Sequence, residues 1–436
     1  MLKHRTNSPR TNSARTRRLT AALISLLAMV FALASPVSLR ADKKKPAAAP
    51  VKPGDQRVKA YFDISKIIWP NPPAITRVKF IDLFTGEKID SKMFAKEKPK
   101  QKWMDRLAGQ QNTDDIKVTD LPFQLIRTYG VGVDSKGKIY AADQSVGAVF
   151  IFDPETKNVE LIGNGKQANF ALIVGVALDD NDRLFVSDAK LHHVLVFSPK
   201  HEAEAVVGTE VLVRPGGIAL DRENRFLYVA DAGLDVVDVF DADTFKLLRQ
   251  IGKPSKKHNQ TDPGTFSLPE CVAVDKDGNL YVTDTFNNRV EIFDADGGFI
   301  SMFGKNGDGP GDLERPKGIA IDSDNHIWVV DDAQDKIKVF DRQGRLLIYI
   351  GDHGFYPGQF MGAWGIAIDK LNRVIVSETF PGRVQMFRYI TDAEAAAEKA
   401  RRETPEQKPA GAAASAQTPA PAQQPSPTAN AAAQKN

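Results

Sequence analysis

The chain has 436 residues, a formal net charge of +3 and a single cysteine, Cys271. One cysteine excludes an internal disulfide framework, so the hydrophobic core must supply the stability of the fold. The charge is unevenly distributed, because residues 1–60 carry 13 Lys and Arg against 2 Asp and Glu, whereas residues 61–390 carry 40 against 48. An acidic folded region disfavours a nucleic-acid partner, since phosphate binding requires a basic face.

Residues 1–34 have the pattern of a secretory signal peptide. Arginines precede an apolar run from Leu19 to Ala34, which ends in the small-residue motif Ala32-Leu33-Ala34. We expect cleavage after Ala34 and export to the periplasm or the extracellular space. An uncleaved membrane anchor is the alternative, but the run is shorter than the ~20 residues of a spanning helix. Residues 35–60 are a basic Pro/Ala-rich linker that would allow a weak contact with membrane lipid or wall polymer.

Residues 61–120 contain two segments that predict regular structure. The stretch AITRVKFIDLF, Ala74–Phe84, has the composition of a strand. Met93–Leu107 places Phe94, Trp103, Met104 and Leu107 among lysines, a pattern that suits a short amphipathic helix lying on the folded domain.

Residues 121–389 consist of six copies of one unit. The unit begins with an alternating apolar segment that ends in Asp, and the copies follow one another at intervals of 42 to 54 residues, as expected for propeller blades. The six segments are GVGVD (Gly130), GVALD (Gly175), GIALD (Gly217), CVAVD (Cys271), GIAID (Gly318) and GIAID (Gly365).

Each copy predicts a four-stranded antiparallel blade. The apolar alternation has a period of two residues, and the short polar gaps allow only hairpins. The first turn carries Gly, Asn or Asp in every copy, which are the residues that adopt a positive φ at low cost. The sixth copy lacks a clear fourth strand, so we expect Ala74–Phe84 to complete it. The predicted fold is an all-β, six-bladed β-propeller closed by an N-terminal strand, with flexible tails at both ends.

Residues 390–436 contain a short helix and a tail. Thr391 and Glu394 have the spacing of a capping box, which predicts a helix that runs to about Glu403. The Ala/Pro/Gln-rich remainder has too few apolar residues to fold.

The blades resemble the NHL-repeat family of six-bladed propellers. Blade four has TDTFNNRVEIFD at Thr283–Asp294, and blade five has RPKGIAID at Arg315–Asp322, both close to the pattern of that family. The resemblance covers Leu121–Phe387. The preceding stretch IWPNPPAITRVKF, Ile68–Phe80, looks like the lead segment of exported bacterial members. The family resemblance implies the propeller fold, but members of such folds serve as binding platforms, lyases and lactonases.

The residues suited to catalysis or metal binding follow the repeat, which favours structural roles. The lyases of this family would require histidines that converge on the channel around zinc. Of the seven histidines, however, His4 lies in the signal region and the others fall at unrelated positions of the repeat or in connections. The strand-end acids suggest either a calcium site or hydrogen bonds to nearby backbone amides, and their recurrence in every blade favours the second. Cys271 occupies the Gly position of a buried strand, which favours an inert thiol. These acids are Asp143, Asp188, Asp231, Asp284, Asp331 and Glu378.

Residues that differ between blades are the candidate binding site. Arginines stand three residues before the Gly position in blades one, three and five only, where they would surround one mouth of the channel. The residues one position before the Gly add polar and aromatic side chains at the same mouth. Together with the arginines, these side chains would suit the binding of an anionic ligand or a peptide. Alternatively, the arginines only pair with nearby carboxylates. We call these seven residues the collar: Arg127, Tyr129, Arg214, Glu270, Arg315, Lys317 and Trp364.

The sequence therefore predicts a non-catalytic binding or scaffolding propeller of the bacterial cell envelope. Its partner would be an envelope protein or a small anionic ligand, recognised at one face of the ring by a monomeric protein. The basic insert Lys253–Thr265 would share in that recognition. No cofactor or metal is predicted. The alternative is a lyase or lactone hydrolase that uses calcium or zinc in the channel.

Overall fold

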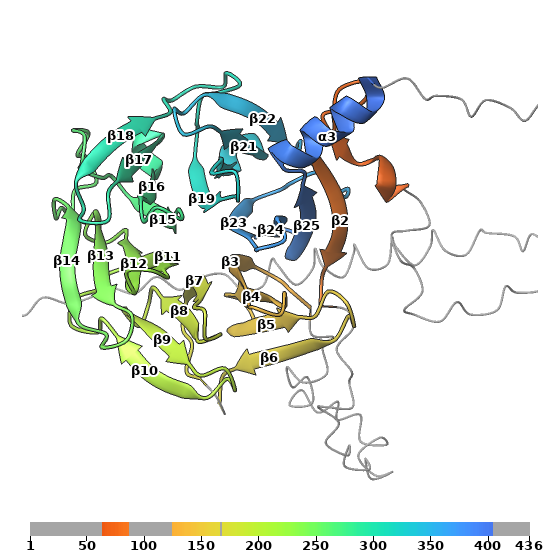
Figure 1. The fold of residues 1–436 in the computed structure, drawn as a ribbon. Coiled ribbons are helices and arrows are strands. Elements are labelled where there is room, and N and C mark those ends of the chain that lie inside the picture. Colours follow the sequence, from red (N-terminus) through yellow and green to blue (C-terminus); the bar gives the residue numbers. More distant parts are fainter. Residues whose placement is uncertain (1–62, 87–123, 166–167, 404–436) are drawn as a thin grey trace, which may run out of the picture. The chain divides into compact units, whose positions relative to one another are not determined.

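The computed structural model describes residues 63–86, 124–165 and 168–403. Six antiparallel sheets are arranged in a ring around a central channel, each with its first strand innermost (Figure 1). The predicted six-bladed propeller is therefore confirmed. Within the described ranges, no helix has the length and apolar character needed to cross a membrane.

Blades one to three each contain four consecutive strands that pair with their sequence neighbours. The strands are β3 (Thr128–Val133), β4 (Ile139–Asp143), β5 (Ala148–Phe152), β6 (Val159–Gly163), β7 (Ile173–Leu178), β8 (Leu184–Asp188), β9 (His193–Phe197), β10 (Ala203–Val207), β11 (Pro215–Asp221), β12 (Phe226–Asp231), β13 (Val236–Asp241) and β14 (Leu247–Gly252).

Blades four and five repeat this arrangement, and blade six takes its outer strands from the N-terminal segment. The strands are β15 (Pro269–Val274), β16 (Leu280–Asp284), β17 (Arg289–Phe293), β18 (Phe299–Phe303), β19 (Pro316–Ile321), β20 (Ile327–Asp331), β21 (Lys336–Phe340), β22 (Leu346–Ile350), β23 (Ala363–Ile368), β24 (Arg373–Glu378), β25 (Arg383–Tyr389), β2 (Val78–Phe84) and β1 (Ile68–Trp69).

The hydrophobic core lies between neighbouring blades. Strands such as β4 and β16 are buried along their whole length, because both of their faces pack against other blades. The fourth strands form the outer rim and are only half-buried, as in β14. The phenylalanine that ends each third strand is at most 2% exposed, which makes these six rings a main part of the core: Phe152, Phe197, Phe240, Phe293, Phe340 and Phe387.

Most hairpins between the first and second strands have the predicted residue with positive φ, for example Gly278 at 82° and Asn325 at 61°. Blade three is the exception, because Arg225 rather than Asn224 takes the left-handed conformation, with φ of 57°. The turn after Asp221 is one residue longer in this blade, which shifts the strained position along the chain.

The predicted closing strand is confirmed. β2 pairs antiparallel with β25, with Phe80 opposite Phe387 and Phe84 opposite Val384, so the two ends of the domain share blade six. The rings of Phe80 and Phe387 pack edge to face at 5.6 Å. The predicted helix at Met93–Leu107 lies outside the described residues.

The α-helix of the described region, α3 (Asp392–Glu403), follows β25 directly. At its N-terminus the backbone N–H of Thr391 donates to Glu394 Oε2 at 2.8 Å, and the Glu394 N–H donates to Thr391 Oγ1 at 3.2 Å. These two bonds form a capping box. Arg77 donates from Nε to the Ile390 carbonyl at 3.2 Å, which links the start of the helix to the segment before β2.

Candidate functional site

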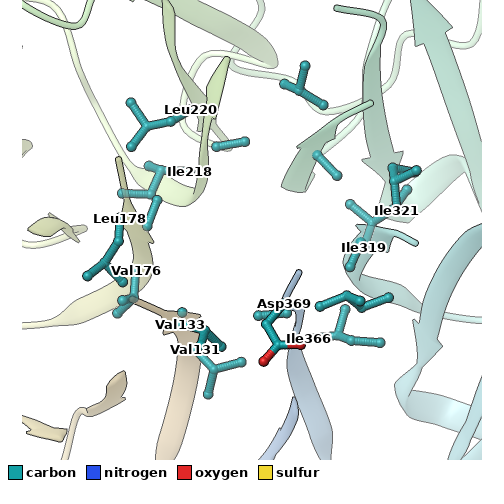
Figure 2. A pocket seen from close by; sticks show the side chains of 18 of the residues that line it. Val131, Val133, Val176, Leu178, Ile218, Leu220, Ile319, Ile321, Ile366 and Asp369 are labelled. Carbon is teal, nitrogen blue, oxygen red and sulfur yellow. The ribbon is translucent and has the colours of Figure 1, made fainter. Parts of the chain in front are cut away.

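The first strands of the six blades enclose a cavity of about 670 Å³ along the ring axis. Figure 2 shows aliphatic side chains around this cavity, with Asp369 beside Ile366. Charged residues of the hairpin turns, such as Asp134 and Asp221, also line the cavity, and its aliphatic part comes from the two apolar positions of each repeat. These are Val131, Val133, Val176, Leu178, Ile218, Leu220, Val272, Val274, Ile319, Ile321, Ile366 and Ile368.

The glycines of the repeat allow the first strands to approach closely. A Cβ on Gly175 would lie 2.6 Å from the Gly216 carbonyl oxygen of the next blade, and one on Gly365 would lie 2.5 Å from that of Tyr129. Cys271 occupies this position in blade four and is buried, and burial raises the pKa of its thiol. This environment favours an inert thiol, as the sequence predicts.

Hydroxyl groups join the first strands of neighbouring blades in alternate blades. Ser187 Oγ donates to the Gly216 carbonyl at 2.6 Å, and Thr283 Oγ1 donates to the Lys317 carbonyl at 2.8 Å. Ser377 bonds the Tyr129 carbonyl in the same way, between blades six and one. The carbonyls of Lys317 and Tyr129 at the collar are therefore fixed in position.

The strand-end acids hold the segments that enter the first strands. Asp143 Oδ2 accepts from the backbone N–H groups of Ile126 at 2.6 Å and Arg127 at 2.8 Å. Asp231 bonds the N–H of Arg214 at 2.8 Å, and Asp331 bonds that of Arg315 at 2.9 Å. The acids are fully buried and serve the backbone, which is the structural role that their recurrence predicts.

Buried cations balance these acids in blades four to six. In blade five Lys338 Nζ lies 3.0 Å from Asp331 Oδ2. Arg289 forms the equivalent ion pair with Asp284 in blade four, and Arg383 forms it with Glu378 in blade six. Sequence reasoning missed this set, although a charged residue inside an apolar third strand was a visible signal. Blade three has Asp238 at the position of Lys338, and burial raises the pKa of Asp238 to about 6.

The structure places all seven collar residues at one end of the ring, which we call the collar face. Arg127, Arg214 and Arg315 are exposed there. Arg315 Nη1 lies 3.2 Å from Asp332 Oδ2, whereas the side chains of the other two arginines have no ion pair among the described residues.

The remaining collar residues form two pairs. The Tyr129 and Trp364 rings lie 5.2 Å apart, and Lys317 Nζ lies 3.0 Å from Glu270 Oε1. Trp364 is only 7% exposed, and both charged side chains are mostly buried. Each of these four residues therefore has a partner within the collar, while the arginine side chains are exposed.

The described histidines do not come together. His258 Nδ1 lies 2.6 Å from Asp235 Oδ1, and His353 Nδ1 lies 2.6 Å from Asp335 Oδ2, each fixing a connection between blades. His326 contacts Asp322 at 3.2 Å. In the described part of the chain, no three His, Cys, Asp or Glu side chains are grouped so that they could hold a metal ion.

Comparison with known proteins places the chain among propellers. Residues 270–338 match a family described as a 6-bladed beta-propeller. Over 96 residues the chain is 31% identical to the probable peptidyl-alpha-hydroxyglycine alpha-amidating lyase of Caenorhabditis elegans, a stretch that is 22% of this chain and 27% of that protein. The chain thus spans about a quarter of the length of this curated relative.

Two solved structures are similar in fold. A Bacteroides thetaiotaomicron protein of unknown function has a TM-score of 0.50 and 18% identity, over 61% of this chain and 70% of that chain. A gluconolactonase of Xanthomonas campestris has a TM-score of 0.47 and 18% identity, over 61% and 86%. The chain is a six-bladed β-propeller. Its resemblance to NHL-repeat propellers is confirmed at the level of the fold.

Proposed function

We propose that this protein is an exported, non-catalytic binding or scaffolding propeller of the bacterial cell envelope, located in the periplasm or outside the cell. It recognises an envelope protein or a small anionic ligand at the collar face. An N-terminal membrane anchor in place of a cleaved signal would hold the same propeller at the membrane.

The observation that carries this proposal is the arrangement of the collar arginines. A buried aspartate fixes the backbone N–H of each arginine, and each side chain is exposed at an equivalent place in an alternate blade. Guanidinium groups bind carboxylates and phosphates through paired hydrogen bonds. Three of them around one mouth therefore suit a partner that presents anionic groups there.

The test is crosslinking of the full chain in envelope extracts, followed by mass spectrometry. The variant R127A/R214A/R315A should lose specific partners, with apparent affinity lowered at least about tenfold, because charge-assisted bonds contribute about 1.5–3 kcal/mol each. The matched control is K136A/K276A/K370A, which removes the same charge at exposed positions on the hairpin face. Equal binding by both variants would refute recognition at the collar face.

A channel-centred, metal-assisted lyase or lactone hydrolase is the second candidate. The match to a probable lyase favours it. Stoichiometric calcium or zinc that survives dialysis, together with turnover of a peptidyl-alpha-hydroxyglycine substrate, would establish this candidate. A protein without turnover that binds a partner through the arginines would support the binding function.

A further inference from the structure

The insert Lys253–Thr265 connects β14 to β15 on the collar face and is held by a buried arginine. Arg289 of blade four, only 6% exposed, donates to the carbonyls of Thr261 and Thr265, each at 2.9 Å. Its Nε also bonds Asp284 Oδ2 at 2.8 Å. A fully paired, buried guanidinium gives the insert a defined backbone position.

Further contacts hold the rest of the insert. Asp235 of blade three binds His258, as described above. Gln260 Nε2 donates to the Lys253 carbonyl at 2.6 Å across the loop, and Asn287 Nδ2 donates to the Gln260 carbonyl at 2.8 Å. The insert is therefore attached to two blades.

The residues of the insert line an open cavity of about 600 Å³. Lys253, Lys256 and Lys257 line it and are exposed, with no ion pair among the described residues. Asp262 is the one acidic residue of the lining, and the remaining groups are mostly amides and hydroxyls, including Asn259 and Thr261. The lining thus carries a net positive charge.

We propose that this cavity binds the phosphate group of a small polar ligand of the sugar-phosphate class. The three ammonium groups would neutralise the phosphate, since lysine binds phosphate as a point charge. The amide and hydroxyl groups of Ser255, Asn259 and Thr261 would hydrogen-bond the sugar. None of the collar arginines lines this cavity, so the proposal does not depend on the function proposed for them.

The test is isothermal titration of the full chain with glucose 6-phosphate, glucose and inorganic phosphate at low salt. We expect saturable binding of glucose 6-phosphate that weakens as salt rises, and no binding of glucose. Inorganic phosphate that binds as tightly as glucose 6-phosphate would identify a phosphate site without sugar recognition and would overturn the ligand class. The absence of binding by either phosphate would overturn the site.

Variants locate the binding. K253A/K256A/K257A should weaken glucose 6-phosphate at least about tenfold, because it removes three charge-assisted contacts. The control K136A/K276A/K370A removes three exposed lysines elsewhere and should bind normally. K253R/K256R/K257R preserves the charge and should retain most of the affinity. Circular dichroism checks the fold of each variant. An equal loss of glucose 6-phosphate affinity in K253A/K256A/K257A and in the control K136A/K276A/K370A would overturn the assignment of the site to the insert.

Discussion

On its third strand, blade three has a buried carboxylate where blade five has a buried lysine. Asp238 on β13 lies diagonally across the strand pair from Asp231 on β12, on the same face, where blade five has the ion pair of Lys338 and Asp331. Both aspartates are fully buried. Gln250 donates to Asp238 Oδ1 at 2.8 Å, but Oδ2 has no hydrogen-bond partner among the described residues. Burial raises the pKa of Asp238 from 3.8 to about 6, and the nearby charge of Asp231 adds to this shift. The hydrogen bond from Gln250 opposes it.

We expect Asp238→Asn to stabilise the protein above neutral pH. The pKa of Asp238 is higher in the folded than in the unfolded state, so its stabilising contribution is present below about pH 4 and is lost as pH rises through about 6. The amide is neutral at every pH, so the variant should gain roughly 1–3 kcal/mol at pH 8 and almost nothing at pH 4.

Urea unfolding of both proteins between pH 4 and pH 8 measures this difference. Asp308→Asn removes an exposed carboxylate and should show no such trend. A constant difference between wild type and Asp238→Asn across the pH range would show that Asp238 does not titrate in this window.

The sequence predicted the structural roles of some residues but not those of others. The recurrence of the strand-end acids correctly predicted their role, because a residue needed by every blade appears in every blade. Asp238 and the pairing of Lys317 with Glu270 were not predicted, since their partners come from elements whose register only the fold provides. The collar positions followed from the repeat, but the burial of Trp364 did not.

The first strands form the tightest part of the ring because glycine brings neighbouring backbones together. The apolar alternation predicted these strands, whereas the close contact between blades depends on distances that no sequence pattern contains. A side chain at the glycine position must therefore displace the backbone of the next blade, which a closed ring resists.

We expect Gly365→Ala to destabilise the protein by about 1–3 kcal/mol through overpacking. The new Cβ would lie 2.5 Å from the Tyr129 carbonyl oxygen and 2.8 Å from Ser377 Oγ. Gly311→Ala is the matched control, since its Cβ would meet only Leu346 Cβ at 3.7 Å. Thermal and denaturant unfolding compare the two, and equal stabilities would show that blades six and one separate without cost.

At the scale of the molecule, one strand closes the ring. β2 covers the outer edge of β25, and its Phe80 side chain is 6% exposed. Without β2, the apolar face of β25 and a row of backbone hydrogen-bonding groups would be open to solvent. The strand composition of this segment and the missing fourth strand of blade six together predicted this closure.

We expect a chain that begins at Gln124 to unfold at a lower temperature and to aggregate, because blade six lacks its outer strand. A synthetic peptide of residues 63–86 should bind the shortened chain and restore much of the lost stability. A peptide of the same composition in scrambled order should not. Calorimetry with and without peptide measures the effect, and an unchanged melting temperature after the deletion would contradict closure by β2.

The pairing of β2 with β25 also means that the ring cannot close before the C-terminal end of the propeller has been made. β2 leaves the ribosome before any blade exists, and the last residue of its partner is Tyr389. At about 5–20 residues per second, the intervening chain takes tens of seconds to make. Throughout that time the edge of β2 that pairs with β25 has no partner, although its other edge can pair with β1. A premature stop codon before β25 would leave the first of these edges unpaired permanently.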